Sequence, residues 1–113
     1  MSEKKRADGT QPTAVVVGVG AERGLGAALC RRFAAAGHHV LVGGRTAGKL
    51  DIVIRQIEAA GGSAEAVAMD GAREADVIAL FDRAMTPGAG KAPADLIVYN
   101  AGNNRKTDFR ELT

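Results

Sequence analysis

The chain has few aromatic residues, one cysteine and no long apolar run, and each scarcity excludes a class of protein. None of its 113 residues is tryptophan and one is tyrosine, so the volume of a core must come from valine, isoleucine and leucine. Cys30 is the single cysteine, which rules out an internal disulfide and indicates a reducing, cytoplasmic setting. No run reaches the roughly 18 apolar residues that span a bilayer, and the polar, basic N-terminus lacks the apolar stretch of a secretory signal.

Charge and length exclude further classes of protein. A formal net charge of +2, scattered along the chain, is too small to predict nucleic-acid binding. His38 and His39 have no partner motif, so we expect packed or surface histidines rather than metal ligands. The length allows one domain at most, and 15 glycines favour an α/β protein with tight turns over a helical bundle.

Hydrophobic periodicity predicts four strands that alternate with three helices. A continuous apolar run predicts a buried parallel strand at residues 14–18, and further strands are predicted at residues 39–43, 63–69 and 95–99. Apolar residues at helical spacing, with Gly37 ending the first helix and Thr46 capping the second, predict helices at residues 25–36, 47–60 and 73–85. The third helix is expected to bury Val77, Leu80, Phe81 and Ala84. Residues 1–12 are expected to be a disordered lead-in and residues 86–93 a loop.

This order of elements determines the expected topology. Strands that alternate with helices imply right-handed crossovers, and therefore a parallel sheet with helices on both faces. The doubly wound rule predicts the spatial strand order 3-2-1-4, with a ligand crevice at the carboxyl ends of strands 1 and 4.

A glycine-rich turn lies at that crevice. Residues 20–26 follow the first strand directly, open the first helix, and carry Gly20, Gly24 and Gly26. Glycines let the backbone approach phosphate oxygens, and the first turn of a helix offers unpaired N–H groups. The pattern predicts a pyrophosphate site that includes the intervening Glu22, Arg23 and Leu25, although an ordinary strand-to-helix turn would have the same glycines.

A second motif follows the fourth strand, at residues 99–102. Together the two motifs resemble the short-chain dehydrogenase/reductase family, in which Thr-Gly-x-x-x-Gly-x-Gly and Asn-Ala-Gly stand at these places. Val19 replaces the usual threonine, and Tyr99 stands where asparagine often does. The resemblance covers residues 13–113 and implies a Rossmann-like dinucleotide-binding half-domain. It also implies that three residues either steady the fourth strand or lie against the adenosine ribose: Asn100, Ala101 and Gly102.

The end of the second strand predicts the cofactor. NAD-binding proteins normally place an acidic side chain there against the ribose hydroxyls, whereas this chain has Gly44 followed by Arg45. We expect Gly44 to leave room for a 2′-phosphate and Arg45 to bind it, with Arg23 as a second basic contact. NADP is therefore the expected cofactor, and the alternative for both arginines is an ordinary solvated side chain.

Asp70 ends the third strand and is followed by Gly71. The resemblance implies that Asp70 accepts a hydrogen bond from the adenine amino group and that Gly71 lies beneath the ring. The alternative for Asp70 is an N-cap of the helix that follows, and one carboxylate can serve both purposes.

The family's catalytic Tyr-x-x-x-Lys pair and upstream serine are absent, because the single tyrosine, Tyr99, is followed four residues later by Asn103. We therefore expect no catalytic residue in this chain. Since subunits of this family have about 250 residues, we interpret the chain as the cofactor-binding half of an NADP(H)-dependent oxidoreductase. The alternatives are a non-catalytic nucleotide-binding module and a structural fragment without a ligand. The fourth strand, whose residues 96–99 are apolar on both faces, predicts self-association or pairing with the rest of the subunit.

Overall fold

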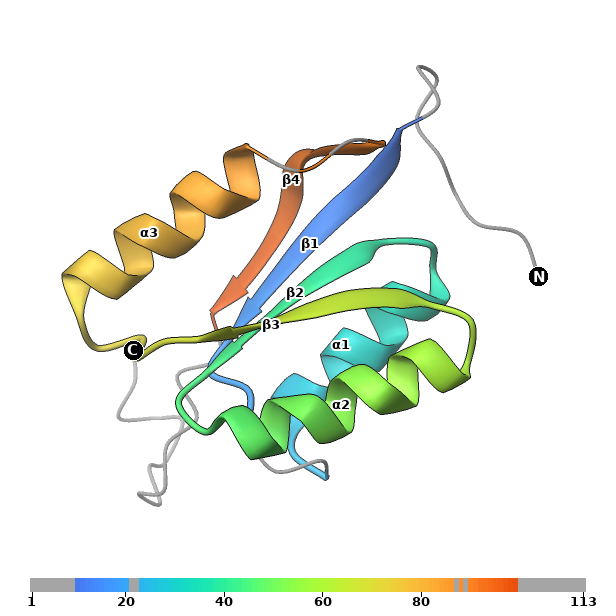
Figure 1. Ribbon diagram of the computed structural model, residues 1–113, viewed down its shortest axis with the longest axis horizontal. Coiled ribbons are helices and arrows are strands. Elements are labelled where there is room, and N and C mark those ends of the chain that lie inside the picture. The colour runs from blue at the N-terminus through green and yellow to red at the C-terminus, as the bar shows by residue number, and fades with distance from the viewer. Residues whose placement is uncertain (1–9, 21–22, 87, 89, 100–113) are drawn as a thin grey trace, which may run out of the picture.

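The computed structural model describes residues 10–20, 23–86, 88 and 90–99, which form a four-stranded parallel sheet with helices on both of its faces (Figure 1). The strand order is β3-β2-β1-β4, so the predicted order is confirmed. The expected lead-in lies outside the described residues except for its last three. The elements in chain order are β1 (Gln11–Val17), α1 (Leu25–Ala35), β2 (His39–Gly44), α2 (Ala47–Ala59), β3 (Ser63–Ala68), α3 (Glu74–Met85) and β4 (Lys91–Tyr99).

β1 is the central strand, and its side chains are buried on both faces of the sheet. Val16 belongs to a cluster with the inner faces of α1 and α2, which includes Cys30 and Leu50. Val15 belongs to a second cluster, in which Leu80 of α3 packs on the opposite face. Figure 1 shows the same division, with α1 and α2 below the sheet and α3 on its other side.

Glycine ends the first two helices, as the sequence predicts for Gly37. Gly37 and Gly61 both have positive φ angles, of 102° and 89°, which an L side chain rarely adopts. In each case the N–H groups of the glycine and of the next residue bond to carbonyls of the last turn, such as His38 N to Phe33 O at 3.1 Å. These paired bonds form the Schellman motif, so each chain reversal into β2 or β3 is fixed locally.

The amino-terminal ends of β1 and β4 differ from prediction. β1 begins at Gln11, and β4 begins at Lys91, inside the segment expected to be a loop. Proline is tolerated there because the β1–β4 register shifts on both sides of Thr13, and Pro93 lies in the irregular part of β4. The Thr13 hydroxyl donates to the Ala92 carbonyl at 2.6 Å and joins the strands across this irregularity.

Three smaller expectations are also wrong in part. Phe81 is 39% exposed, because it lies at the margin of the face of α3 that buries Leu80 and Ala84. Thr46 occupies the N-cap position of α2, but its side chain makes no capping hydrogen bond. The four apolar residues at the end of β4 are partly exposed, as expected, yet the complete strand also contains Lys91 and Pro93 near its start, residue types typical of guarded edges. No helix in the described part of the chain is long and apolar enough to cross a membrane.

Candidate functional site

The turn after β1 is tied to the end of β2 by its backbone. The N–H groups of Gly18 and Val19 both donate to the Gly43 carbonyl, at 2.9 and 2.8 Å. Gly18 has a φ of 92°, so its backbone makes the sharp bend away from the strand direction. The chain therefore leaves β1 at a defined angle toward the start of α1.

The start of α1 has the features of an anion site. Gly24 is its N-cap, with extended backbone and no side chain, and the first turn contains no acidic residue. Among the described residues, nothing lies within 4 Å of where a Cβ on Gly20 would be, so this position is open. Unpaired N–H groups and the positive end of the helix dipole meet at this opening, an arrangement that favours a phosphate.

The remaining residues of this turn differ in exposure. Arg23 is exposed, Leu25 is 65% exposed, and Gly26 is buried against the core side of α1. Glu22 lies outside the described residues. Gly26 is therefore shielded from solvent, whereas the Arg23 side chain is accessible to a ligand.

Gly44 has a different role from the one expected. It is buried at the end of β2, and a Cβ added there would lie 2.2 Å from the Val19 carbonyl oxygen. The space that the missing side chain leaves is therefore filled by the turn after β1, and it is not available to a ribose phosphate. Arg45, the next residue, is exposed and is the first side chain beyond the strand that is free to reach a ligand.

Asp70 supports the turn between β3 and α3. Its Oδ1 accepts a bond from the N–H of Ala72 at 2.9 Å, and its own N–H donates to Oδ2 of Asp76 at 2.9 Å. The N-cap of α3 is Arg73, three residues after Asp70, so the alternative interpretation of Asp70 as the N-cap is wrong. Within the described residues, the second carboxylate oxygen of Asp70 accepts no hydrogen bond.

Tyr99 completes this edge of the sheet, and sequence reasoning assigned it no function. Its hydroxyl donates to the Gly71 carbonyl at 3.0 Å, and a Cβ on Gly71 would lie only 3.0 Å from Cε1 of its ring. The end of β4 is thereby joined to the turn after β3. The only sequence signal was the departure from asparagine at this position. The predicted site residues Asn100, Ala101 and Gly102 lie outside the described residues.

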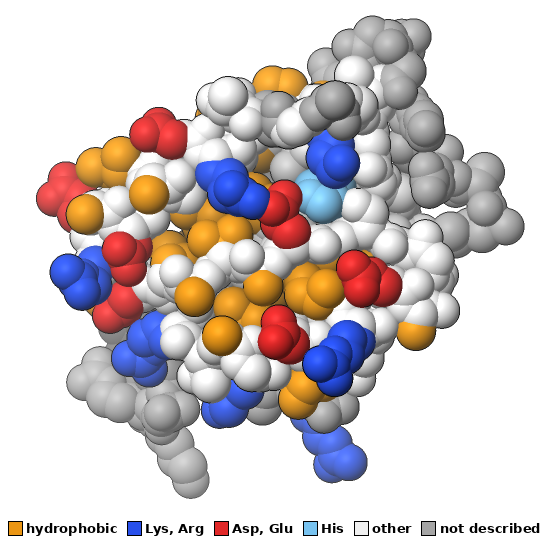
Figure 2. Space-filling view, viewed as in Figure 1, with side chains coloured by type: hydrophobic (Ala, Val, Ile, Leu, Met, Phe, Trp, Pro, Cys, Tyr) orange, Lys and Arg blue, Asp and Glu red, His pale blue; other side chains and the backbone are white. Residues whose placement is uncertain are grey.

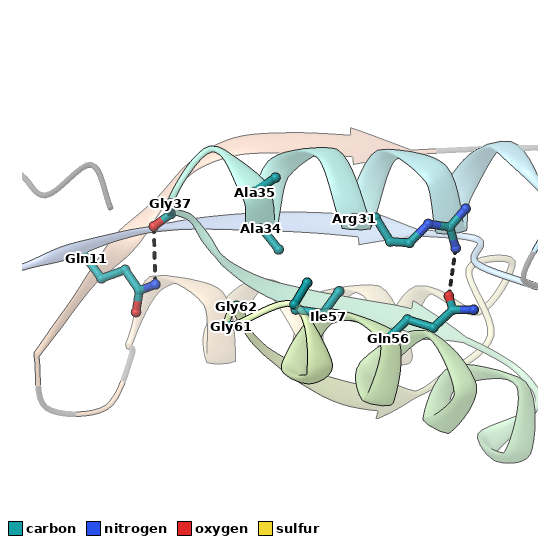
Figure 3. A pocket seen from close by; sticks show the side chains of 10 residues that line it. Gln11, Arg31, Ala34, Ala35, Gly37, Gln56, Ile57, Gly61 and Gly62 are labelled. Carbon is teal, nitrogen blue, oxygen red and sulfur yellow. Dashed lines mark hydrogen bonds between the residues drawn. The ribbon is translucent and has the colours of Figure 1, made fainter. Parts of the chain in front are cut away.

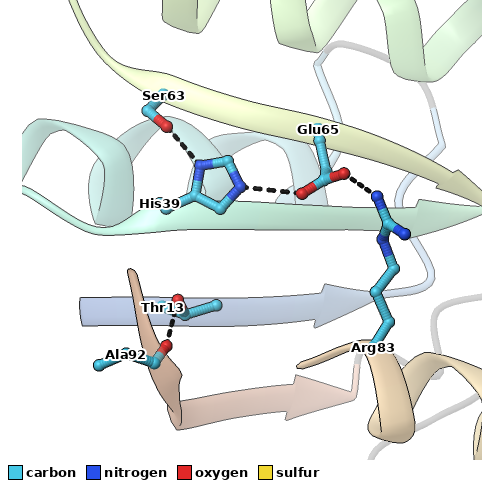
Figure 4. A network of polar contacts seen from close by, with 6 residues as sticks. All are labelled: Thr13, His39, Ser63, Glu65, Arg83 and Ala92. Carbon is cyan, nitrogen blue, oxygen red and sulfur yellow. Dashed lines mark hydrogen bonds and ion pairs between the residues drawn. The ribbon is translucent and has the colours of Figure 1, made fainter. Parts of the chain in front are cut away.

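Charged side chains of both signs are interspersed on the face seen in Figure 2, with apolar side chains between them. A polar network joins buried His39 of β2 to Ser63 and Glu65 of β3, and the partly exposed Glu65 pairs with exposed Arg83 of α3 (Figure 4). Partial burial acts to raise the pKa of Glu65, but hydrogen bonds from His39 and Arg83 outweigh it and hold the pKa below 4.5. His39 is thus a packed histidine, as expected, and no three metal-ligating side chains cluster in the described part of the chain.

A hollow of about 120 Å³ lies between the C-terminal ends of α1 and α2 (Figure 3). The Arg31 guanidinium bonds to the Gln56 amide oxygen at 2.9 Å on one side of it, and Gln11 bonds to the Gly37 carbonyl at 3.2 Å on the other. This hollow is at the amino-terminal edge of the sheet, opposite the glycine turn. It is also too small for a dinucleotide, so it is separate from the candidate site.

Comparison with known proteins agrees with this geometry. Residues 13–113 match the family described as short chain dehydrogenase. The 3beta-hydroxysteroid dehydrogenase 1 of Eggerthella lenta is 45% identical over 89 residues, which make up 77% of this chain and 33% of that protein. The chain therefore spans about a third of the length of this relative.

Two solved structures share the fold. A short-chain dehydrogenase from Rhodopseudomonas palustris has a TM-score of 0.73 and 33% identity, with 90% of this chain and 45% of that one covered. A metagenomic short-chain oxidoreductase in complex with NADP has a TM-score of 0.69 and 35% identity, with 84% and 41% covered.

Proposed function

The chain belongs to the short-chain dehydrogenase/reductase family, and on this premise we propose that it forms the cofactor-binding part of an NADP(H)-dependent oxidoreductase. The reaction would be hydride transfer between the nicotinamide and a carbonyl or alcohol. The cytoplasm, where NADP(H) is plentiful and thiols such as Cys30 stay reduced, is the proposed location.

The start of α1 carries this proposal. Its open, acid-free first turn after a glycine bend offers N–H groups to the pyrophosphate, and we assign this contact to the backbone from Gly20 to Gly26. Arg45 and Arg23 are exposed near the same edge of the sheet, and we assign them to the 2′-phosphate. A guanidinium binds phosphate through two parallel hydrogen bonds, which favours NADP(H) over NAD(H).

The rest of the proposed site lies at the ends of β3 and β4. We assign the unbonded carboxylate oxygen of Asp70 to the adenine amino group, and Gly71 to the surface beneath the base. The residues from Asn100 to Gly102 complete the proposed binding set. The solved NADP complex of the metagenomic relative supports this choice of cofactor by analogy.

Within this proposal the chain binds and orients, and it does not move protons. The bound cofactor supplies the hydride. The sequence has no Tyr-x-x-x-Lys pair to supply the proton, and the Tyr99 hydroxyl is engaged with a backbone carbonyl. The second candidate function is a nucleotide-binding module without catalysis. Reductase activity with NADPH, measured on a longer protein that contains this chain, separates the two candidates, because this chain by itself is expected to be inactive under either one.

The test of cofactor preference is a titration of the purified protein with NADPH and NADH, followed by nicotinamide fluorescence. Each charge-assisted contact contributes about 1.5–3 kcal/mol, so Arg45→Ala should weaken NADPH binding by about one to two orders of magnitude and leave NADH binding nearly unchanged. Arg55→Ala, which removes an exposed arginine from α2, is the matched control and should change neither affinity. Equal wild-type affinities for the two cofactors would refute the assignment.

A further inference from the structure

Tyr99 joins two elements of the proposed nucleotide site that the sequence keeps 28 residues apart. Its ring is 58% exposed at the carboxyl end of β4, and core packing alone would not place a tyrosine there. The hydroxyl reaches across to the Gly71 carbonyl at 3.0 Å, and the ring packs so close to Gly71 that a Cβ there would lie 3.0 Å from Cε1, a tight contact. The residue therefore fixes the backbone immediately after Asp70.

Among the described residues, the Asp70 carboxylate bonds within its own loop, and the N–H of the preceding Met69 donates to the Gly44 carbonyl at 2.7 Å, which holds the end of β3 against β2. Oδ1 accepts a bond from the Ala72 N–H, and the Asp70 N–H donates to the Asp76 carboxylate in the first turn of α3, six residues along the chain. These bonds define the shape of the turn, but they do not define where the turn lies relative to β4. Among the described residues, the Tyr99–Gly71 bond is the side-chain hydrogen bond that joins this turn directly to β4.

We propose that Tyr99 is a positioning residue for the adenine end of the cofactor: its hydroxyl holds the Asp70–Gly71 turn at the distance at which Asp70 reaches the amino group of the base. The proposal rests on the proposed function. Tyr99 makes no contact with the reacting atoms and contributes through Asp70. Its effect is therefore expected on recognition of the base, not on the phosphate contacts at the start of α1.

The test compares NADPH with its hypoxanthine analogue, in which a carbonyl replaces the adenine amino group. Tyr99→Phe keeps the ring and removes the hydroxyl. It should weaken NADPH binding by about two- to tenfold, the equivalent of one hydrogen bond, and change binding of the hypoxanthine analogue much less. Asp70→Asn should reduce the same discrimination, and the double variant should lose no more than the larger single effect, because both changes remove one interaction.

Thr13→Val is the matched control. Thr13 makes the corresponding hydroxyl-to-carbonyl bond between β1 and β4 at the opposite end of this strand pair (Figure 4), so its loss affects the sheet but not the turn after β3. Its ratio of NADPH to analogue affinity should equal that of the wild type. An unchanged ratio in Tyr99→Phe would overturn the positioning role, whereas a wild-type protein that binds neither nucleotide would overturn the proposed function itself.

Discussion

Gly44 offers the sharpest test of the structure, because adding one methyl group there forces the backbone to move. The Cβ of Gly44→Ala would lie 2.2 Å from the Val19 carbonyl oxygen and 2.9 Å from Cδ2 of Leu50. Ordinary contacts begin near 3.4 Å, so the carbonyl must retreat by more than 1 Å. The adjoining N–H groups of Gly18 and Val19 are bonded to Gly43 and would be pulled out of alignment.

The expected loss of stability follows from these contacts. Overpacking costs about 1–3 kcal/mol, and each weakened backbone hydrogen bond about 1 kcal/mol, which gives about 2–5 kcal/mol in total. Since a domain of this size is stable by only about 5–15 kcal/mol, much of the folding free energy would be lost. Urea unfolding, followed by circular dichroism at low protein concentration, measures this change.

The neighbouring residue provides the control for Gly44. A Cβ on Gly43 would make only ordinary contacts, the nearest being 3.5 Å from Sδ of Met69 and from the Val16 carbonyl oxygen. Gly43→Ala should therefore shift the free energy of unfolding by less than about 1 kcal/mol. Two alanine variants of equal stability would contradict the packing of the first turn on β2.

Four further outcomes are expected. Burial raises the pKa of the Cys30 thiol to about 12, so a maleimide should label Cys30 only after denaturation; rapid labelling of the native protein would contradict its burial. The pKa of Glu65 is lowered from 4.5 in the folded state, so its contribution to stability is present above that pH and is lost as the pH falls through the folded pKa. Glu65→Gln should therefore reduce the pH dependence of urea unfolding in acid. An unchanged pH profile would show that the network does not contribute to stability. The 113-residue chain should reduce no carbonyl substrate, and NADPH oxidation that Gly24→Val abolishes would show that a proton donor has been overlooked. Sedimentation should show self-association of the chain through β4, where Ile97 and Tyr99 are exposed. A monodisperse monomer would exclude pairing with a second copy of the chain.

The arrangement of elements was predictable because it depends on local patterns. The apolar run at β1, the helical spacing of Leu50 and Ile57, and the glycine at residue 37 each determine their element with little help from distant residues. Once the alternation of strands and helices was recognised, general rules of handedness gave the strand order. The glycine turn was correctly placed at the start of α1 for the same reason.

The errors arose where distant segments meet. Proline at residue 93 disfavours a strand when the segment is considered alone. The irregular pairing of β4 with β1 around Thr13 makes this proline acceptable within the strand. Gly44 suggested free space, but the space belongs to the Val19 carbonyl, which approaches from a turn 25 residues away in sequence. The contact between Tyr99 and Gly71 likewise depends on how two loops lie in space. Such contacts have no signature in either segment alone.

The contacts that hold α3 in place have a consequence for local unfolding. Its first turn is bonded to the loop after β3 through Asp76, and Arg83 near its last turn reaches Glu65 within β3, while its apolar face packs on β1 through Leu80. The helix is thus bonded at its start to the loop after β3 and near its end to β3 itself, while its apolar face packs on β1. Local unfolding proceeds in cooperative units, and we expect these connections to couple the opening of α3 to fraying of the β3 edge. Thermal fluctuation at the edge of the sheet is thereby coupled to release of the helix that covers its centre.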